Sequence, residues 1–431
     1  MKKAAFFVFT LNFLLPGLAL ALTPSSPYKT GEQVCLSYQN EHGVRVQVPI
    51  NYDEPHLGTT SIYAWTFEPF NSNKPTVLVF FGGPGSSAHD SKEQYQYLKD
   101  WNIILFDQRG VACSRPETAT LIDDHNYYRS ESIARDGAEI LKSFGAHQVS
   151  IWGHSYGTVP ATIFASFFPE KTRALILEGV IYDGGPALWQ PPHKLKLIQK
   201  FFNQLPANLK VRILQLSAHP QLDPFWFSDL VKYLMYSKDW EKLTTHVLTG
   251  FFEQEEASLI SMLQGYGRGS EERSRSEDSE EFGAFTFLHI ACREFDARQE
   301  YANRLAYFDK GRLYPAKYTA YADECEKRKI PIKLYRATDY PLTVPVYYFN
   351  GTTDGATEAP AAIRHYKNVA QGPAQLFLVQ DSGHVPVSDL NENGQFHKLF
   401  SRVLSGEKLT KEDISNFNDQ SELDIRFTEH F

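Results

Sequence analysis

The 431-residue sequence has no excess of basic residues and little cysteine. It contains 43 Lys and Arg residues against 51 Asp and Glu residues, a net charge of −8, which excludes a large nucleic-acid footprint because such a surface needs a basic face. Four cysteines are too few for a disulfide-dominated miniprotein. Hydrophobic residues make up 42% and charged residues 22%, which excludes a mainly disordered chain. Composition therefore predicts a soluble, globular protein.

The sequence also lacks an apolar run of the roughly 20 residues that a membrane-spanning helix needs. The longest run at the N-terminus, Ala4–Leu15, follows Lys2 and Lys3 and precedes the small residues of Ala19-Leu20-Ala21. A short basic start, an apolar segment and two small residues two positions apart are typical of a secretory signal peptide. We expect residues 1–21 to be a signal peptide and the mature protein to be secreted or periplasmic, without stable membrane insertion. An uncleaved anchor is the alternative.

Zinc-ligand spacing of Cys and His is absent, as is the HExxH motif, so no metal or other cofactor is predicted. An even number of cysteines in an exported chain suggests two disulfides instead, for which three pairings exist. Their positions favour Cys35–Cys113 and Cys292–Cys325. Free buried thiols are the alternative, and spacing does not decide between the two.

Short apolar segments alternate with helical patterns in the first part of the chain. Segments 76–81 and 103–106 are almost wholly apolar, as in strands that are buried on both faces of a parallel sheet. Strands that alternate with helices at this spacing predict an α/β fold with a mostly parallel, doubly wound sheet. The predicted strands here are 44–50, 61–67, 76–81, 103–106, 149–152 and 174–177, and the predicted helices are 130–144 and 158–168.

Strand patterns are almost absent from residues 185–340, where helical patterns predominate. We therefore expect a core of residues 22–184 and 341–431 that is interrupted by a helical cap insertion, 185–340. Within the insertion, the charged, serine-rich stretch Ser270–Glu281 is expected to be a solvated loop, with a docking surface as the alternative. The predicted helices of the insertion are 194–205, 225–236, 240–253 and 285–308. The second part of the core has predicted strands 344–350 and 375–379 and predicted helices 359–367 and 396–404.

The pentapeptide Gly153-His154-Ser155-Tyr156-Gly157 stands between predicted strand 149–152 and predicted helix 158–168. It matches G-x-S-x-G, in which the serine occupies a sharp strand-to-helix turn that needs small neighbours. The turn holds the serine hydroxyl at the carboxyl edge of the sheet, where clefts form. We predict that Ser155 is a catalytic nucleophile; a structural turn serine is the alternative.

A serine hydroxyl needs a base that removes its proton, and the base needs a carboxylate that orients it. His384 follows the last predicted strand and Asp354 follows the penultimate one, which gives the nucleophile–acid–base order of an α/β hydrolase. His154 is a weaker candidate for the base, because side chains adjacent on such a turn diverge. Asp381 is a weaker candidate for the acid, because it is too near His384 in the sequence. A turn-forming or capping role is the alternative for Asp354.

Reaction at a carbonyl also needs hydrogen-bond donors for the developing oxyanion. Gly82-Gly83-Pro84-Gly85 follows predicted strand 76–81, and we predict that the backbone amides of Gly83 and Tyr156 form the oxyanion hole. A phosphate-binding loop is excluded, because the G-x-x-x-x-G-K-[ST] pattern is missing. In the DQRG sequence at 107–110, Asp107 and Arg109 are expected to make a structural turn beside the site.

The chain resembles the prolyl aminopeptidase family of α/β hydrolases in GGPG at 82–85, DQRG at 107–110 followed by Ser114, GHSYG at 153–157, Asp354 and Gly383-His384. The cysteines, the N-terminal segment and the long insertion resemble its secreted tripeptidyl-aminopeptidase branch. The resemblance covers about residues 35–404 and implies a serine exopeptidase with a helical cap over its site. Phe81 and Ala112 depart from the family pattern, which has histidine and glycine there, and this difference bears on substrate range rather than on hydrolysis.

An exopeptidase must meet the α-ammonium group of its substrate with a carboxylate, because burying that charge alone is costly. In the family, acidic residues of the cap do this, and the segment His289–Ala297 resembles that part of the cap. The resemblance makes Glu294 the first candidate, with Glu178 and Asp296 as alternatives.

The expected partners are therefore peptides with a free N-terminus, cleaved through an acyl-enzyme. An esterase or lipase with the same triad, and a non-catalytic binding protein on a hydrolase scaffold, are the competing hypotheses. The sequence predicts no oligomeric state.

Overall fold

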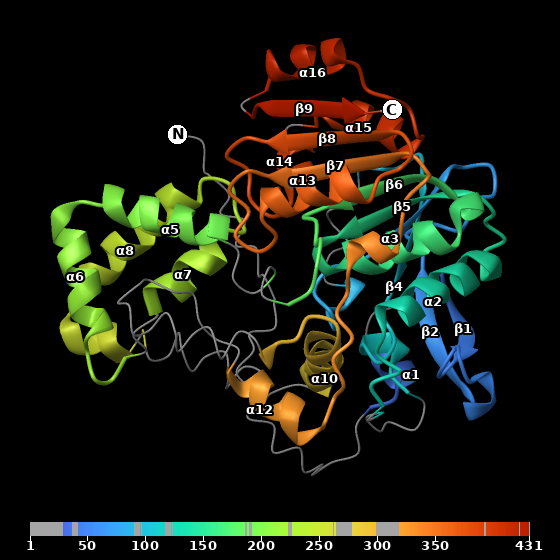
Figure 1. Cartoon of the computed structure of the whole chain (residues 1–431), viewed down its shortest axis with the longest axis horizontal. Helices are drawn as coiled ribbons and strands as arrows, with labels where there is room; N and C mark the ends of the chain where they lie inside the picture. Colours follow the sequence, from blue (N-terminus) through green and yellow to red (C-terminus); the bar gives the residue numbers. More distant parts are fainter. Residues whose placement is uncertain are drawn as a thin grey trace.

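The computed structural model contains one nine-stranded sheet with helices on both faces (Figure 1). It describes residues 29–36, 42–89, 95, 97–116, 122, 124–185, 188, 192–222, 226–261, 263, 278–298, 319–391, 394–421 and 423–430. The predicted signal peptide, residues 1–21, lies outside these ranges, as do residues 270–277 of the serine-rich stretch and residues 299–308 of the last helix predicted for the insertion. Within these ranges, no helix has the length and apolar character that a membrane span requires.

The strands of the sheet lie in the order β1-β2-β4-β3-β5-β6-β7-β8-β9. Neighbours from β4 to β8 pair in parallel, whereas β1–β2, β2–β4 and β8–β9 are antiparallel. The mostly parallel, doubly wound sheet predicted from the sequence is thereby confirmed. The strands are β1 (Gly43–Pro49), β2 (Thr59–Trp65), β3 (Thr76–Phe80), β4 (Asn102–Phe106), β5 (Val149–His154), β6 (Thr172–Glu178), β7 (Val346–Gly351), β8 (Ala374–Val379) and β9 (Ile425–His430).

The central strands consist mainly of apolar residues because both of their faces are covered. Leu78 of β3 belongs to the hydrophobic core on one face of the sheet, and its neighbour Val77 belongs to the core on the other, as the alternation of side chains along a strand requires. Helices α2 (Ser130–Ser143), α3 (Thr158–Phe167) and α13 (Ala359–Asn368) contribute to the first core. Helices α14 (Pro386–Asn391), α15 (His397–Leu404) and α16 (Lys411–Asn418) contribute to the second.

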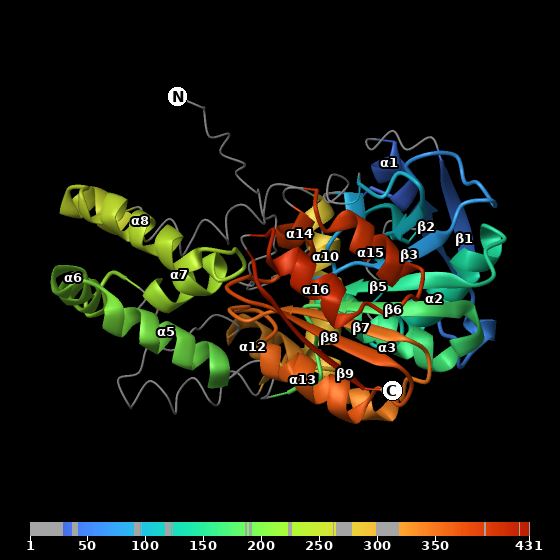
Figure 2. The ribbon, with the colours of Figure 1, turned by 90° about the horizontal axis from the view of Figure 1, so that it is seen from above.

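The described residues between β6 and β7 are mainly helical and form two groups. Helices α5 (Pro192–Gln204), α6 (Ala207–Ser217), α7 (Trp226–Leu234) and α8 (Trp240–Phe252) stand to one side of the sheet and share a core of their own (Figures 1 and 2). Helix α10 (Asp278–Arg293) instead places Phe285 and Ile290 in the first core, and α12 (Thr319–Lys327) packs beside α10. We call the first group, α5 to α8, the helical unit.

Helix α10 differs from the helix predicted over 285–308. It begins earlier, at Asp278, and ends at Arg293. Just beyond this end, Asp296 adopts a left-handed backbone conformation (φ 47°) and the Ala297 amide donates to the carbonyl of Ala291 (3.0 Å). The chain therefore folds back over the last turn instead of continuing as a helix.

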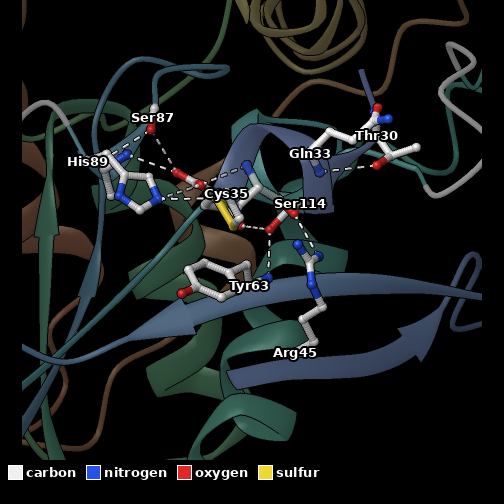
Figure 3. The surroundings of a disulfide bond; sticks show 11 residues. Thr30, Gln33, Cys35, Arg45, Tyr63, Ser87, His89 and Ser114 are labelled. Carbon is white, nitrogen blue, oxygen red and sulfur yellow. Dashed lines mark hydrogen bonds and ion pairs between the residues drawn. A yellow bond between two sulfur atoms is a disulfide. The ribbon is translucent and has the colours of Figure 1, made fainter. Parts of the chain in front are cut away.

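Both favoured cysteine pairings are confirmed. Cys35, at the end of α1 (Gly31–Cys35), is bonded to Cys113 in the segment after β4, and Figure 3 shows the surroundings of this disulfide. Cys292 of α10 is bonded to Cys325 of α12. Each disulfide therefore ties a short helix to a neighbouring element.

A buried ion pair fixes the segment after β4 to α2. Arg109 donates from Nε to Asp136 (2.8 Å) and from a terminal nitrogen to the other carboxylate oxygen (2.6 Å), and it also donates to the carbonyl of Ile50 (2.9 Å). Both side chains are buried. The expected turn within DQRG is thus held differently: Arg109 pairs with Asp136, while Asp107 binds other groups described below.

Asp136→Ala is expected to lower the free energy of unfolding by about 3–5 kcal/mol, because it leaves the buried Arg109 charge without a partner. Asp53→Ala is the matched control. Asp53 also pairs with an arginine, Arg129 (2.7 Å), but its side chain is 58% exposed, so the loss should stay below about 1 kcal/mol. Urea unfolding of the two variants measures both losses of free energy. Equal losses would contradict the greater importance of the buried Arg109–Asp136 ion pair for stability.

Candidate active site

The predicted triad residues and the predicted oxyanion loop all follow strands whose carboxyl ends meet at one edge of the sheet. Gly82–Gly85 follows β3, Ser155 follows β5, Asp354 lies three residues after β7, and His384 follows β8. Strands β3, β5, β6, β7 and β8 are consecutive neighbours and run in parallel. Segments that are far apart in the chain are therefore brought to a single edge.

Ser155 occupies a strained turn directly after β5. Its backbone has φ 51°, a left-handed conformation that is uncommon for a residue other than glycine, and it opens the 3-10 turn η4 (Ser155–Gly157) that leads into α3. The turn is packed tightly, because a Cβ atom added at Gly157 would overlap the carbonyl oxygen of Phe80. This is the geometry in which a serine hydroxyl stands exposed above a sheet.

Asp354 and His384 are joined by a buried hydrogen bond. His384 Nδ1 lies 2.9 Å from Asp354 Oδ2, and the two residues are only 3% and 1% exposed. Asp354 Oδ1 also accepts from the amides of Ala356 (2.7 Å) and Thr357 (2.9 Å), and the Thr357 hydroxyl donates to Oδ2 (2.8 Å). With these donors the carboxylate has a fixed orientation, and it selects the imidazole tautomer that carries its proton on Nδ1.

The structure does not bring Ser155 and His384 into a hydrogen bond. His384 Nε2 is buried and has no hydrogen-bond partner among the described residues. The ring nevertheless lies beside the end of β6, the strand next to β5. A Cβ atom added at Gly179, directly after β6, would be 3.0 Å from His384 Cε1. Glu178, the last residue of β6, is in register with His154, the residue before Ser155. Hydrogen bonds of this kind are often long before a substrate binds.

The Gly82–Gly85 loop passes directly beside the serine. A Cβ atom added at Gly82 would be 3.0 Å from Ser155 Cβ. Gln108 holds the loop, because its side chain accepts from the Gly85 amide (3.2 Å) and donates to the carbonyl of Phe81 (3.1 Å).

His154 and Glu178 are committed to the interior. His154 Nδ1 pairs with Glu178 Oε2 (2.7 Å), and its Nε2 lies 3.2 Å from the Tyr95 hydroxyl. The other oxygen of Glu178 accepts the amide of Val387 (2.8 Å), in the helix that follows His384. Sequence reasoning did not reveal this supporting role of Glu178, because both of its partners are remote in the chain.

Glu294 lies just past the end of α10, buried against the start of α2. Its Oε1 accepts the Ser130 amide (2.8 Å), its Oε2 accepts the Ser130 hydroxyl, and the same hydroxyl lies 2.8 Å from the hydroxyl of Tyr156. Burial raises the pKa of Glu294 from 4.5 to about 7, although the bonds from Ser130 oppose that rise. A chain of hydrogen bonds thus links Glu294 to the residue after Ser155.

One group of metal-ligand types occurs within the described ranges, in the loops that follow β3 and β4. His89, Asp107 and Cys113 place ligand atoms within 4.8 Å of one another, with His89 Nε2 3.3 Å from Asp107 Oδ2. The sulfur of Cys113 is bonded to Cys35. Asp107 accepts hydrogen bonds from the Ser87 hydroxyl and from the Cys113 amide, both at 3.0 Å. Figure 3 shows Ser87 and His89 beside this disulfide. These contacts hold the loop after β3 against the loop after β4.

Comparison with known proteins supports the fold. A family profile of the alpha/beta hydrolase fold matches residues 75–389. Proline iminopeptidases of Xylella fastidiosa and Heyndrickxia coagulans are 29% and 30% identical over 110 and 135 residues, which are 26% and 31% of this chain and 34% and 44% of theirs. The serine protease Hip1 of Mycobacterium bovis is 23% identical over 210 residues, 38% of this chain and 40% of its own. The chain thus spans less than half the length of these relatives.

Among solved structures, a thermophilic esterase of Thermogutta terrifontis aligns with 84% of this chain and 99% of its own, at 15% sequence identity and a TM-score of 0.42. A likeness at this level says nothing about substrate.

Gly157→Ala is expected to cost about 1–3 kcal/mol of unfolding free energy, because the added methyl group would overlap the Phe80 backbone. Gly250→Ala in α8 is the matched control: a Cβ atom there meets nothing within 4 Å, and alanine should stabilise the helix by up to about 1 kcal/mol. Thermal or urea unfolding of both variants measures the difference. Wild-type stability of Gly157→Ala would contradict the tight turn.

Proposed function

Since the chain belongs to the α/β-hydrolase family, we propose that it is an exported serine aminopeptidase of the prolyl or tripeptidyl type. The observation that carries this proposal is the buried Asp354–His384 hydrogen bond at the sheet edge where Ser155 stands. The printed names of its relatives, proline iminopeptidase and serine protease, support peptides as substrates. Two disulfides support an oxidising compartment such as the bacterial envelope.

In the proposed mechanism, Ser155 Oγ attacks the carbonyl carbon of the scissile peptide bond while His384 Nε2 accepts the hydroxyl proton. Asp354 stabilises the imidazolium that forms, and the amides of Gly83 and Tyr156 stabilise the oxyanion. His384 then gives the proton to the leaving amine, which departs and leaves an acyl-enzyme. A water molecule, deprotonated by His384, attacks the ester and releases the N-terminal product and Ser155.

Recognition of the substrate N-terminus is assigned to Glu294. Its carboxylate is fixed by Ser130 and lies at the amino end of α2, where the helix dipole favours negative charge. The hydrogen-bond chain through Ser130 and Tyr156 places this carboxylate close to the residue that follows the nucleophile. The proposal gives this role to Glu294 rather than to Glu178, because Glu178 already pairs with the imidazole of His154 (2.7 Å), whereas Glu294, among the described residues, accepts only from the neutral groups of Ser130. The helical insertion, residues 185–340, is proposed to act as the cap.

The proposed exopeptidase should distinguish peptides with free and acetylated N-termini. Acetylation removes the ammonium group that pairs with Glu294 and leaves a buried carboxylate without its partner, so kcat/KM is expected to fall at least about 30-fold. Matched peptide pairs assayed by mass spectrometry measure the ratio, with Ser155→Ala as the inactive control. Equal cleavage of both peptides would exclude an aminopeptidase and favour an esterase-like hydrolase with the same triad.

The affinity for a free N-terminus should depend on the ionisation of Glu294. Its pKa of about 7 means that the carboxyl group becomes protonated and neutral as the pH falls below that value, and a neutral acid attracts the ammonium group only weakly. KM should therefore rise several-fold between about pH 7.5 and about pH 6. Glu294→Gln is expected to have a raised KM that changes little over this interval.

Asp296→Asn is the matched control for that experiment, because it neutralises a neighbouring buried acid and should keep the wild-type dependence of KM on pH. A pH-independent KM in the wild-type enzyme, or loss of the dependence only in Asp296→Asn, would assign recognition to another group.

A further inference from the structure

The turn that follows α7 in the helical unit lies against both loops of the proposed acid–base pair. The amide of His384 donates to the carbonyl oxygen of Tyr236 (2.9 Å), and the amide of Gly355 donates to the carbonyl oxygen of Met235 (3.4 Å). Gly355 directly follows Asp354 in the chain. One short turn of the insertion thus bonds to the loop after β7 and to the loop after β8.

These three segments are packed without spare room. A Cβ atom added at Gly383 would overlap the carbonyl oxygen of Tyr236, and one added at Gly355 would overlap the Cβ atom of Met235. Each loop therefore has a glycine at the point where the turn crosses it. The turn cannot move toward either loop without displacing the residue next to that glycine, which is His384 in one loop and Asp354 in the other.

The ring of Tyr236 also contacts the imidazole itself. The two ring centroids are 4.8 Å apart and the planes meet at 76°, an edge-to-face arrangement. The imidazole Nδ1 lies 2.9 Å from Asp354 Oδ2 and 3.3 Å from the Thr357 hydroxyl, but both contacts are at that one nitrogen, so the ring can still tilt about it. A second contact from another direction restricts this tilt, and with it the direction in which Nε2 points.

The helical unit makes a second set of contacts with the loop after β7, which contains Asp354. At the start of α5, the amide of His193 donates to Glu358 Oε2 (3.1 Å), and its ring Nε2 lies 3.1 Å from the carbonyl oxygen of Thr352. Thr352 and Glu358 flank Asp354 in the chain. The unit is therefore attached to the Asp354 loop at two places, which keeps the turn after α7 in register with the loops beneath it.

We propose that Tyr236 is a positioning residue that keeps the His384 imidazole aligned with Ser155. The inference rests on the proposed function, and it makes the helical unit a part of the catalytic apparatus as well as a cover over the site. Because Tyr236 acts on the imidazole and not on the substrate N-terminus, its loss should affect the rate of acylation more than substrate binding.

Steady-state kinetics of Tyr236→Ala with a free-N-terminus peptide tests the proposal. Misalignment of the base is expected to lower kcat by about 10- to 100-fold, while KM stays within about 2-fold of wild type. Tyr236→Phe keeps the edge-to-face ring and should retain wild-type kcat. Tyr236→Leu keeps apolar volume without the ring and should lose kcat as Tyr236→Ala does, so the proposal stays testable if the smaller side chain prevents folding.

Two further measurements separate positioning from general packing. The downfield proton resonance of the Asp354–His384 hydrogen bond should broaden or disappear in Tyr236→Ala and persist in Tyr236→Phe. Phe252→Ala, which truncates a partly buried ring on the core of the same helical unit, should leave both kcat and this resonance unchanged. Wild-type kcat in Tyr236→Ala, or an equal loss in Phe252→Ala, would overturn the proposal.

Phosphonylation of Ser155 by a fluorophosphonate distinguishes failure of this inference from failure of the proposed function. Slower labelling in Tyr236→Ala than in the wild-type protein supports the positioning role. Equal labelling rates refute that role and leave the serine hydrolase intact, whereas a wild-type protein that is not labelled refutes both.

Discussion

The site depends on one buried hydrogen bond, between Asp354 and His384. The carboxylate is oriented by two backbone amides and a hydroxyl, and this orientation in turn determines which imidazole nitrogen faces away from it. Burial strengthens the bond electrostatically and makes an unpaired carboxylate at this position costly. The parallel order of β5, β6, β7 and β8 is what allows this bond to form beside Ser155, since each of the three residues follows the carboxyl end of a different strand.

The insertion contacts this edge from two directions. Glu294, at the end of α10, reaches the start of α2 and is linked through Ser130 to Tyr156, whereas Tyr236, after α7, bonds to the loop of His384. The first contact is the one to which we assign recognition of the substrate ammonium group, and the second is the one to which we assign positioning of His384. Under these two proposals the insertion would both select the substrate terminus and stabilise the arrangement that acts on it.

Local signals were sufficient to predict the parts of the molecule that short segments determine. Apolar runs predicted the central strands, and the glycines around Ser155 predicted the turn that displays it. Asp354 and His384 could be chosen because each follows a strand that was itself predictable. The interior role of Glu178 and the partner of Arg109 were not predictable, because both depend on residues that only the tertiary fold brings near. The end of α10 was not predicted, because the chain reverses there at Asp296, an aspartate in a left-handed conformation, and not at a glycine or proline. Strand β9 was not predicted either; it is an antiparallel edge strand that pairs only with β8.

A crystal structure of the protein with a peptide boronic acid bound would test the central claim most directly. A boronate imitates the tetrahedral intermediate of acyl transfer. The account predicts a covalent bond from boron to Ser155 Oγ, His384 Nε2 within hydrogen-bond distance of that adduct, Nδ1 still on Asp354, and one boronate oxygen on the amides of Gly83 and Tyr156. An adduct on another residue, or an imidazole that has left Asp354 and does not face the adduct, would contradict it.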